Sequence, residues 1–207
     1  MHPNPVFRKE TEDRNVAFAR ERAFGTLAIN ADDGPLISHI PFRISEDASE
    51  VELHLVRSNP IVRILKEPKN AVLAVTGGDA YISPDWYEVD DQVPTWNYIA
   101  VHLRGELSLL PHDELHDVLD GLSAEMEERL LPKKPWTSGK MDQEIYARMQ
   151  RQIVPAKLRV SEINGTWKLS QNKPEEVRMR AANGVSENSM GSETDEIAQL
   201  MRNVVCE

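Results

Sequence analysis

The chain has 207 residues and a net charge of −10, enough length for one sizeable hydrophobic core but little room for two full domains. This acidic balance argues against a nucleic-acid-binding protein, because such proteins gather Lys and Arg against phosphates. No apolar run approaches the roughly 20 residues that span a bilayer, residues 1–10 lack an apolar signal core, and the single cysteine, Cys206, fits a reducing compartment. We therefore expect a cytoplasmic protein with an unpaired thiol in its tail.

The first third of the chain predicts a helix followed by three strands. Thr11 is a suitable N-cap for a helix over 11–23. Strand-like runs follow at 24–29 and 35–44, with turn residues between them, and residues 50–56 alternate apolar and polar side chains. Ser58, Asn59 and Pro60 then favour the start of a short helix.

The middle of the chain predicts further strands and two helices. An apolar strand over 71–76 is expected to break at Gly77-Gly78 and to resume at 80–83. Residues 96–110 form the last long strand of this set, with Gly105 as a candidate bulge. Apolar side chains at helical spacing predict a helix over 111–131, and another is expected over 142–152.

The last quarter predicts a hairpin and a helical tail. Asn164-Gly165 suits a tight turn between strands at 156–163 and 166–169. A helix is expected over 175–182, then a polar linker over 184–194 and a terminal helix over 196–205. Short strands at hairpin spacing, with few intervening helices, favour a mainly β antiparallel barrel over a doubly wound sheet. We expect a barrel domain over 1–183 and a linker with a terminal helix over 184–207.

Arg57, Ser58 and Asn59 lie where a predicted strand ends and a short helix begins. The first turn of a helix has free backbone N–H groups, and a guanidinium and a hydroxyl add further donors, so the segment suits a phosphate. The alternative is a capping turn with an exposed arginine.

Two other segments suit a flat, polar-edged ligand. Residues 81–87 and 93–98 interleave Trp and Tyr with Ser, Asp, Thr and Asn. The alternative is that these aromatics fill a barrel seam or a subunit interface. Residues 168–173 carry amide, hydroxyl and ammonium groups, although a solvated loop has the same composition.

A metal site is not predicted. His112 and His116 have the spacing of a zinc-protease helix, but Asp113 stands where that motif needs glutamate, and no third ligand is evident. A solvated helix face explains this spacing better.

Taken together, the segments resemble the PaiB family, the FMN-binding negative transcriptional regulators. The resemblance covers roughly residues 5–175 and rests on Phe24–Leu27, Gly34–Leu36, Ser38–Pro41, Arg57–Pro60, Tyr81–Tyr87, Val93–Tyr98 with Val101, His102 and Gly105, and Trp167–Asn172. It implies a split antiparallel β-barrel with peripheral helices, related to the pyridoxamine-phosphate-oxidase flavoproteins. It also implies a homodimer with FMN at the subunit interface.

The resemblance implies the cofactor-binding residues as well. The phosphate would lie at the strand-to-helix junction, the second barrel strand would run beside the isoalloxazine ring, and the second subunit would add aromatic and amide groups. The implied residues are Ser38, His39, Ile40, Arg57, Ser58, Asn59, Trp96, Asn97, Lys168, Ser170, Gln171 and Asn172. Lys173 stands where the family often has arginine, which weakens any bidentate contact with an anion.

Three functions stay open on this reading. The first is an FMN-binding regulator of transcription, although no helix-turn-helix with a basic recognition helix is evident, so we expect weak DNA binding at best. The second is a flavin-dependent oxidoreductase for a small substrate, in which the flavin supplies the redox chemistry. The third is a haem-binding protein in which His39, His54 or His102 ligates iron.

Overall fold

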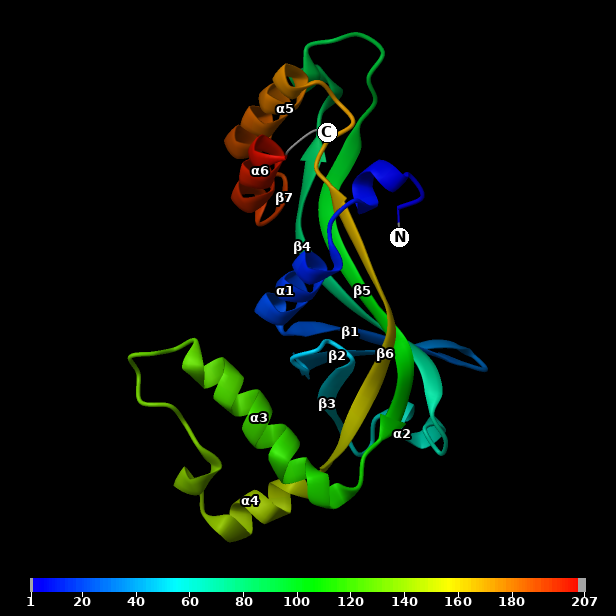
Figure 1. The fold of residues 1–207 in the computed structure, drawn as a ribbon, viewed down its shortest axis with the longest axis vertical. Coiled ribbons are helices and arrows are strands. Elements are labelled where there is room, and N and C mark those ends of the chain that lie inside the picture. Colours follow the sequence, from blue (N-terminus) through cyan, green and yellow to red (C-terminus); the bar gives the residue numbers. More distant parts are fainter. Residues whose placement is uncertain (1, 205–207) are drawn as a thin grey trace. The chain divides into compact units, whose positions relative to one another are not determined.

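The computed structural model describes residues 2–204 and separates into two compact units. The barrel unit comprises residues 16–75 and 102–163, and the tail unit comprises the described parts of 1–15, 76–101 and 164–207. Strands β4 (Lys69–Ile82), β5 (Thr95–Leu109) and β6 (Ile153–Lys168) contribute to both units (Figure 1). No helix in residues 2–204 is both long enough and apolar enough to cross a membrane.

The barrel unit is built on a strand order that closes on itself. Its own strands are β1 (Phe24–Ala31), β2 (Gly34–Ile44) and β3 (Glu50–Val56). Because β1 pairs antiparallel with both β2 and β4, the order β1-β2-β3-β6-β5-β4 forms a ring without a free edge. Alternate side chains point inward, so that Leu27, Leu53 and Leu73 are fully buried.

The barrel unit also contains helices that lie outside this ring. They are the end of α1 (Glu12–Arg22), α2 (Pro60–Ile64), α3 (Leu115–Glu128) and α4 (Gln143–Gln150). The buried side chains of α3 are Leu115, Val118 and Leu122, and the helix packs against β2 and β3. Gly121 permits this approach, because a Cβ there would lie 2.6 Å from Cζ of Arg43.

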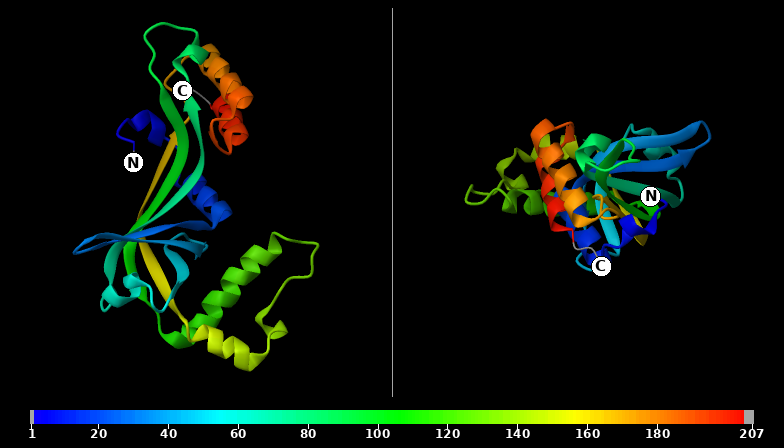
Figure 2. Two further views of the ribbon diagram at one scale, coloured as in Figure 1. Left: turned by 180° about the vertical axis from the view of Figure 1, so that it is seen from behind. Right: turned by 90° about the horizontal axis from the view of Figure 1, so that it is seen from above.

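The tail unit packs two helices side by side. They are α5 (Glu175–Asn188) and α6 (Thr194–Asn203), and both views in Figure 2 show them in contact. Ala181, Ala182 and Ile197 are fully buried in this unit. The two-residue strand β7 (Gly191–Ser192) extends the sheet by pairing antiparallel with β4. Short 3-10 turns complete the fold at Pro5–Arg8 (η1), Pro84–Tyr87 (η2), His112–Glu114 (η3) and Ser138–Lys140 (η4).

The predicted fold class, an antiparallel split barrel with peripheral helices and a helical C-terminal region, is confirmed. The hairpin β1–β2, strand β3 and strand β5 lie within a few residues of the predicted ranges. The predicted caps also hold, since Thr11 Oγ1 accepts from the Arg14 amide at 3.2 Å and Asn59 Oδ1 from the Ile61 amide at 2.9 Å. Val205, the predicted end of the terminal helix, and Cys206, the predicted unpaired thiol, lie outside the described residues.

The predicted break at Gly77-Gly78 is wrong, because β4 runs unbroken from Lys69 to Ile82. Gly78 serves helix packing instead of a turn. A Cβ at this position would lie 3.0 Å from Cγ1 of Ile197 and 3.1 Å from the Glu193 carbonyl oxygen. Similarly, a Cβ on Gly105 would lie 1.9 Å from the Arg159 carbonyl oxygen, so this glycine permits close backbone contact between β5 and β6.

The predicted hairpin at Asn164-Gly165 is also wrong, because β6 continues straight through both residues. Gly165 is buried, and a Cβ there would lie 2.0 Å from Oδ1 of Asn15. The same Asn15 oxygen accepts a hydrogen bond from Trp167 Nε1 at 2.8 Å. The glycine is therefore required by the contact with Asn15, and tertiary packing overrides the local turn preference.

The predicted polar linker over 184–194 is largely structured. Helix α5 extends to Asn188, and both Gly184 and Val185 are buried. A Cβ on Gly184 would lie 2.4 Å from the Trp86 ring, so this glycine lets the helix pack on an aromatic side chain. The predicted terminal helix is present as α6.

Candidate functional site

The predicted phosphate-binding segment, Arg57, Ser58 and Asn59, lies in the barrel unit together with Ser38, which was predicted to lie beside the flavin ring. These four residues are here called the barrel donor cluster. Asn59 Nδ2 donates to Ser38 Oγ at 3.1 Å, which joins β2 to the start of α2. Since Asn59 Oδ1 also accepts from the Ile61 amide to cap α2, both the nitrogen and the oxygen of this side chain are hydrogen-bonded within the protein. Arg57 and Ser58 remain exposed beside it.

Arg57 is partly committed to the protein itself. Its Nε donates to the Arg151 carbonyl at 2.8 Å, and one Nη donates to the Ile153 carbonyl at 3.2 Å. These bonds fix the guanidinium against the chain that enters β6, and its other Nη group has no hydrogen-bond partner among residues 2–204. An anion here would rely on Arg57 and the Ser58 hydroxyl, because α2 has only five residues and a correspondingly small dipole.

The other two predicted residues of β2 face opposite sides of the strand. His39 is exposed, and its Nδ1 lies 3.1 Å from Thr26 Oγ1. Ile40 is 3% exposed and points into the core, so only its backbone is available to a ligand.

A second group lies in the tail unit and lines a pocket of about 270 Å³, here called the tail pocket. Its walls come from η1, η2, β5, the end of β6 and the loops that follow η2 and β6. The lining residues are Phe7, Tyr87, Asp91, Gln92, Val93, Thr95, Asn97, Lys168, Ser170, Asn172 and Lys173. Four predicted residues, Asn97, Lys168, Ser170 and Asn172, therefore come together here.

A hydrogen-bonded chain of three buried side chains forms the back of the tail pocket. Asn97 Nδ2 donates to Ser170 Oγ at 2.9 Å and contacts Met201 Sδ at 3.3 Å. Tyr87 Oη lies 3.2 Å from the same Ser170 oxygen. Burial raises the pKa of Tyr87, so its phenol stays protonated at neutral pH. Ser170 also holds the left-handed φ of 61°, a conformation that is costly for a residue with a side chain.

Two lysines enter the tail pocket from its rim. The Lys168 ammonium donates to the Thr95 hydroxyl, and the Lys173 ammonium donates to the side-chain oxygen of Gln92. Burial lowers the pKa of Lys168. Both groups are thus paired with neutral oxygens.

Two other predicted residues lie elsewhere in this unit. Trp96 is 44% exposed on the face of β5 opposite Asn97 and packs edge-on against Tyr81, with the ring centres 6.1 Å apart. The side-chain oxygen of Gln171 accepts from the Leu169 amide at 2.7 Å, so it stabilises its own loop.

Phe7, Asp91 and Gln92 line the tail pocket but lie outside the segments that the sequence analysis singled out. Tyr87 and Lys173 lie within the predicted 81–87 and 168–173 segments, although neither was named as a cofactor-binding residue. Phe7 carries no local signal, because only the folded chain brings it to this pocket.

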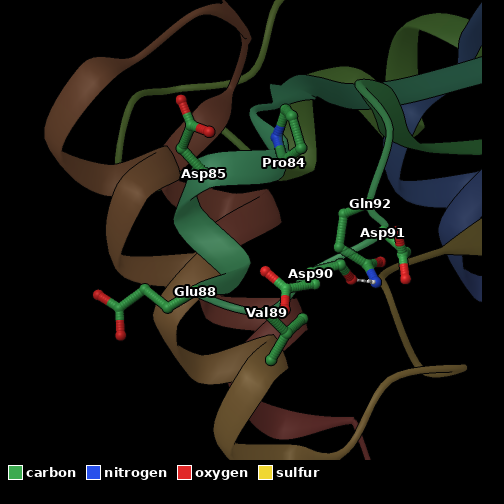
Figure 3. A pocket seen from close by; sticks show the side chains of 7 residues that line it. All are labelled: Pro84, Asp85, Glu88, Val89, Asp90, Asp91 and Gln92. Atoms are coloured by element: carbon green, nitrogen blue, oxygen red, sulfur yellow. Dashed lines mark hydrogen bonds between the residues drawn. The ribbon is translucent and has the colours of Figure 1, made fainter.

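An acidic loop follows η2 and lines a second, open hollow of about 500 Å³. Figure 3 shows Asp85, Glu88, Asp90 and Asp91 around it, with Gln92 Nε2 donating to the Asp90 carbonyl at 2.9 Å. Within residues 2–204, no group of three or more His, Cys, Asp or Glu side chains is arranged to hold a metal ion.

His54 and His102, which lie on strands, each have one buried ring nitrogen. The Nδ1 atoms of His54 and His102 are both buried without a hydrogen-bond partner. Burial lowers the pKa of each imidazole, so both rings are held neutral. An iron ion could reach these Nδ1 atoms only after the surrounding side chains had moved.

Comparisons with known proteins define the class and then the family. The fold matches the FAD- and haem-binding protein of Mycobacterium smegmatis, with a TM-score of 0.57, 17% identity and coverage of 78% of this chain and 73% of that one. It also matches the flavocytochrome of Azotobacter vinelandii, with a TM-score of 0.54, 15% identity and coverage of 81% and 72%. The chain thus shares its fold with these two proteins.

Sequence comparisons give the family. The family model described as "Putative FMN-binding domain" matches residues 1–162. The protease synthase and sporulation protein PAI 2 of Bacillus subtilis is 30% identical over 200 residues, which is 95% of each chain. An uncharacterized protein of Saccharomyces cerevisiae is 34% identical over 124 residues, covering 54% of this chain and 73% of that one. The chain belongs to this FMN-binding domain family, and the predicted PaiB-type, flavin-binding class is confirmed.

Proposed function

We propose that the chain binds FMN as a cytoplasmic homodimer, with the phosphate at the barrel donor cluster and the ring near the tail unit of the partner. The observation that carries this proposal is the Ser38–Asn59 hydrogen bond, because it unites two predicted flavin segments 21 residues apart in the sequence. In this arrangement the partner subunit's Trp96 approaches the ring, whereas Asn97 is fully buried on the opposite face of β5 and acts only within its own subunit.

The barrel donor cluster fits an anionic cofactor end. Arg57 is exposed and already oriented by the Arg151 and Ile153 carbonyls, so little side-chain freedom is lost when it binds a phosphate. The exposed Ser58 hydroxyl adds a neutral donor. Bound flavin would supply hydride or electron transfer, and the protein supplies binding and orientation.

A regulatory role follows the family resemblance, and a flavin-dependent oxidoreductase is the second candidate. The tail pocket favours this second candidate, because its buried polar groups and lysines are suited to a small substrate. Haem binding through His39, His54 or His102 is the third, and the exposed His39 is the most accessible of these side chains.

The absorbance spectrum of the purified protein, with and without added FMN, tests the proposal. Flavin bands that co-purify, or quenching of FMN fluorescence on titration, would support it. A Soret band without flavin bands would favour haem binding. Turnover of NADH or NADPH by the flavin-loaded protein would then favour an enzyme over a regulator.

A further inference from the structure

The tail pocket contains two lysines, although the protein as a whole is acidic and an acidic loop adjoins this pocket at Asp91. The chain carries a net charge of −10, yet Lys168 and Lys173 line one pocket. Neither lysine forms an ion pair with a carboxylate in residues 2–204, and each donates to a neutral oxygen. Asp91 lines the same pocket, so the lining carries about one net positive charge. This balance suits a monoanion better than a phosphate dianion.

Asn97 supplies an acceptor that the protein leaves unused. The side chain is fully buried, its Nδ2 is committed to Ser170 and Met201, and its Oδ1 has no hydrogen-bond partner. A buried amide oxygen without a donor is costly, and such groups are rare in native structures. Asn97 lines the tail pocket, but this oxygen has almost no solvent contact, so a ligand N–H or O–H group reaches it only when the Asn97 side chain turns towards the pocket.

The remaining walls are apolar and limit the size of a ligand. Phe7, Val93 and the ring of Tyr87 line the pocket, and Phe7 and Tyr87 are almost completely buried. Its volume of about 270 Å³ lies just below the range of about 300–1,000 Å³ that is usual for drug-sized ligands. A whole flavin nucleotide, with its tricyclic ring and phosphorylated side chain, exceeds this space.

We propose that the tail pocket binds a small organic carboxylate that carries a hydroxyl group beside the carboxylate and an apolar body. The carboxylate lies between the ammonium groups of Lys168 and Lys173. The hydroxyl group donates to Asn97 Oδ1 once this side chain has turned towards the pocket, and the apolar body lies against Phe7 and Val93. The proposal extends beyond flavin binding and requires only that the flavin phosphate lies outside the tail pocket.

Calorimetric titration of the flavin-free, full-length protein tests this proposal. The probes are mandelate, which has the carboxylate, the hydroxyl and the apolar ring, phenylacetate, which lacks the hydroxyl, and benzyl alcohol, which lacks the carboxylate. We expect mandelate to bind roughly threefold to tenfold more tightly than phenylacetate, as one neutral hydrogen bond provides. Benzyl alcohol should not bind measurably.

Four variants assign the binding to the pocket. Lys168→Gln and Lys173→Gln should each weaken mandelate binding by about tenfold or more, because each removes a charge-assisted contact. Lys134→Gln is the matched control, since Lys134 is exposed outside the pocket, and it should bind as the wild type does. Asn97→Asp keeps the shape of the side chain but adds a negative charge that repels a carboxylate ligand, so this variant should also bind mandelate more weakly. Circular dichroism checks that each variant is folded.

Three results would overturn the proposal: no saturable mandelate binding by the wild type, wild-type binding by both pocket lysine variants, or loss of FMN but not riboflavin binding in those variants. The last result would mean that the pocket holds the flavin phosphate. The flavin proposal fails separately, through a lack of FMN fluorescence quenching by the wild type, which leaves the mandelate titration unaffected.

Discussion

Arg57→Ala separates phosphate recognition from folding. In the wild type, Arg57 Nε and one Nη hold the Arg151 and Ile153 carbonyls, which leaves the second Nη for a phosphate. One charge-assisted hydrogen bond contributes about 1.5–3 kcal/mol, so the variant should bind FMN about 10- to 100-fold more weakly. Riboflavin has no phosphate, and its affinity should hardly change. Loss of the two carbonyl contacts at this exposed site should lower the free energy of unfolding by about 1–2 kcal/mol.

The assay is fluorescence quenching of FMN and of riboflavin by the wild type, Arg57→Ala and Arg63→Ala. Arg63 is an exposed arginine at the end of α2 and is the matched control, so its variant should bind both ligands normally. An equal loss of both ligands in Arg57→Ala would indicate a folding defect. No loss of either ligand would refute the assignment and move the phosphate towards Lys168 and Ser170.

Four further predictions follow from the charge, burial and packing. Sedimentation equilibrium at micromolar concentration should show a dimer, and a species of only 23.5 kDa would contradict the proposed interface. Because the net charge is −10, the protein should bind DNA weakly and without sequence preference, and specific nanomolar binding at physiological salt would contradict this. Burial lowers the folded-state pKa values of His54 and His102, so the unfolded chain binds more protons below about pH 6.5. The contribution of these two residues to the free energy of unfolding should therefore be fully present above that pH and decrease as the pH falls towards the folded pKa values. Denaturant unfolding at a series of pH values should show a smaller decrease for His54→Gln than for the wild type. Gly165→Ala should reduce the free energy of unfolding by about 1–3 kcal/mol, because its Cβ would lie 2.0 Å from Asn15 Oδ1, and an unchanged melting temperature would refute this packing argument.

Local sequence patterns were sufficient to predict a strand that has one buried face and a helix that begins at a capping residue. Alternation over 50–56 and the Asn59-Pro60 pair each identified an element that the structure contains. Glycine was the main source of error. Gly78, Gly165 and Gly184 suggested breaks, yet each lies within a regular element where a side chain or backbone from a distant segment leaves no room for a Cβ. A single sequence contains no record of such distant neighbours.

The absence of information on distant neighbours also limits how much of the candidate site the sequence can predict. The 38–40 and 57–59 segments are joined by the Ser38–Asn59 bond, which neither segment shows by itself. The tail pocket also needs Phe7, whose sequence position is 161 residues from Lys168 and gives no hint of their closeness. The roles assigned to the predicted cofactor residues stay predictions until the titrations are done.

The contact between Asn97 and Met201 joins the last helix of the described chain, α6, to the tail pocket. The family model ends at residue 162, whereas Lys168, Ser170, Lys173 and the Met201 sulfur that holds the Asn97 amide all come later in the chain. If the tail pocket binds the proposed carboxylate, relatives that share the matched region would differ in the ligand they accept wherever their last forty residues or so differ. For the same reason, a shortened version that ends after the matched region would keep the barrel donor cluster but lose one wall of the tail pocket.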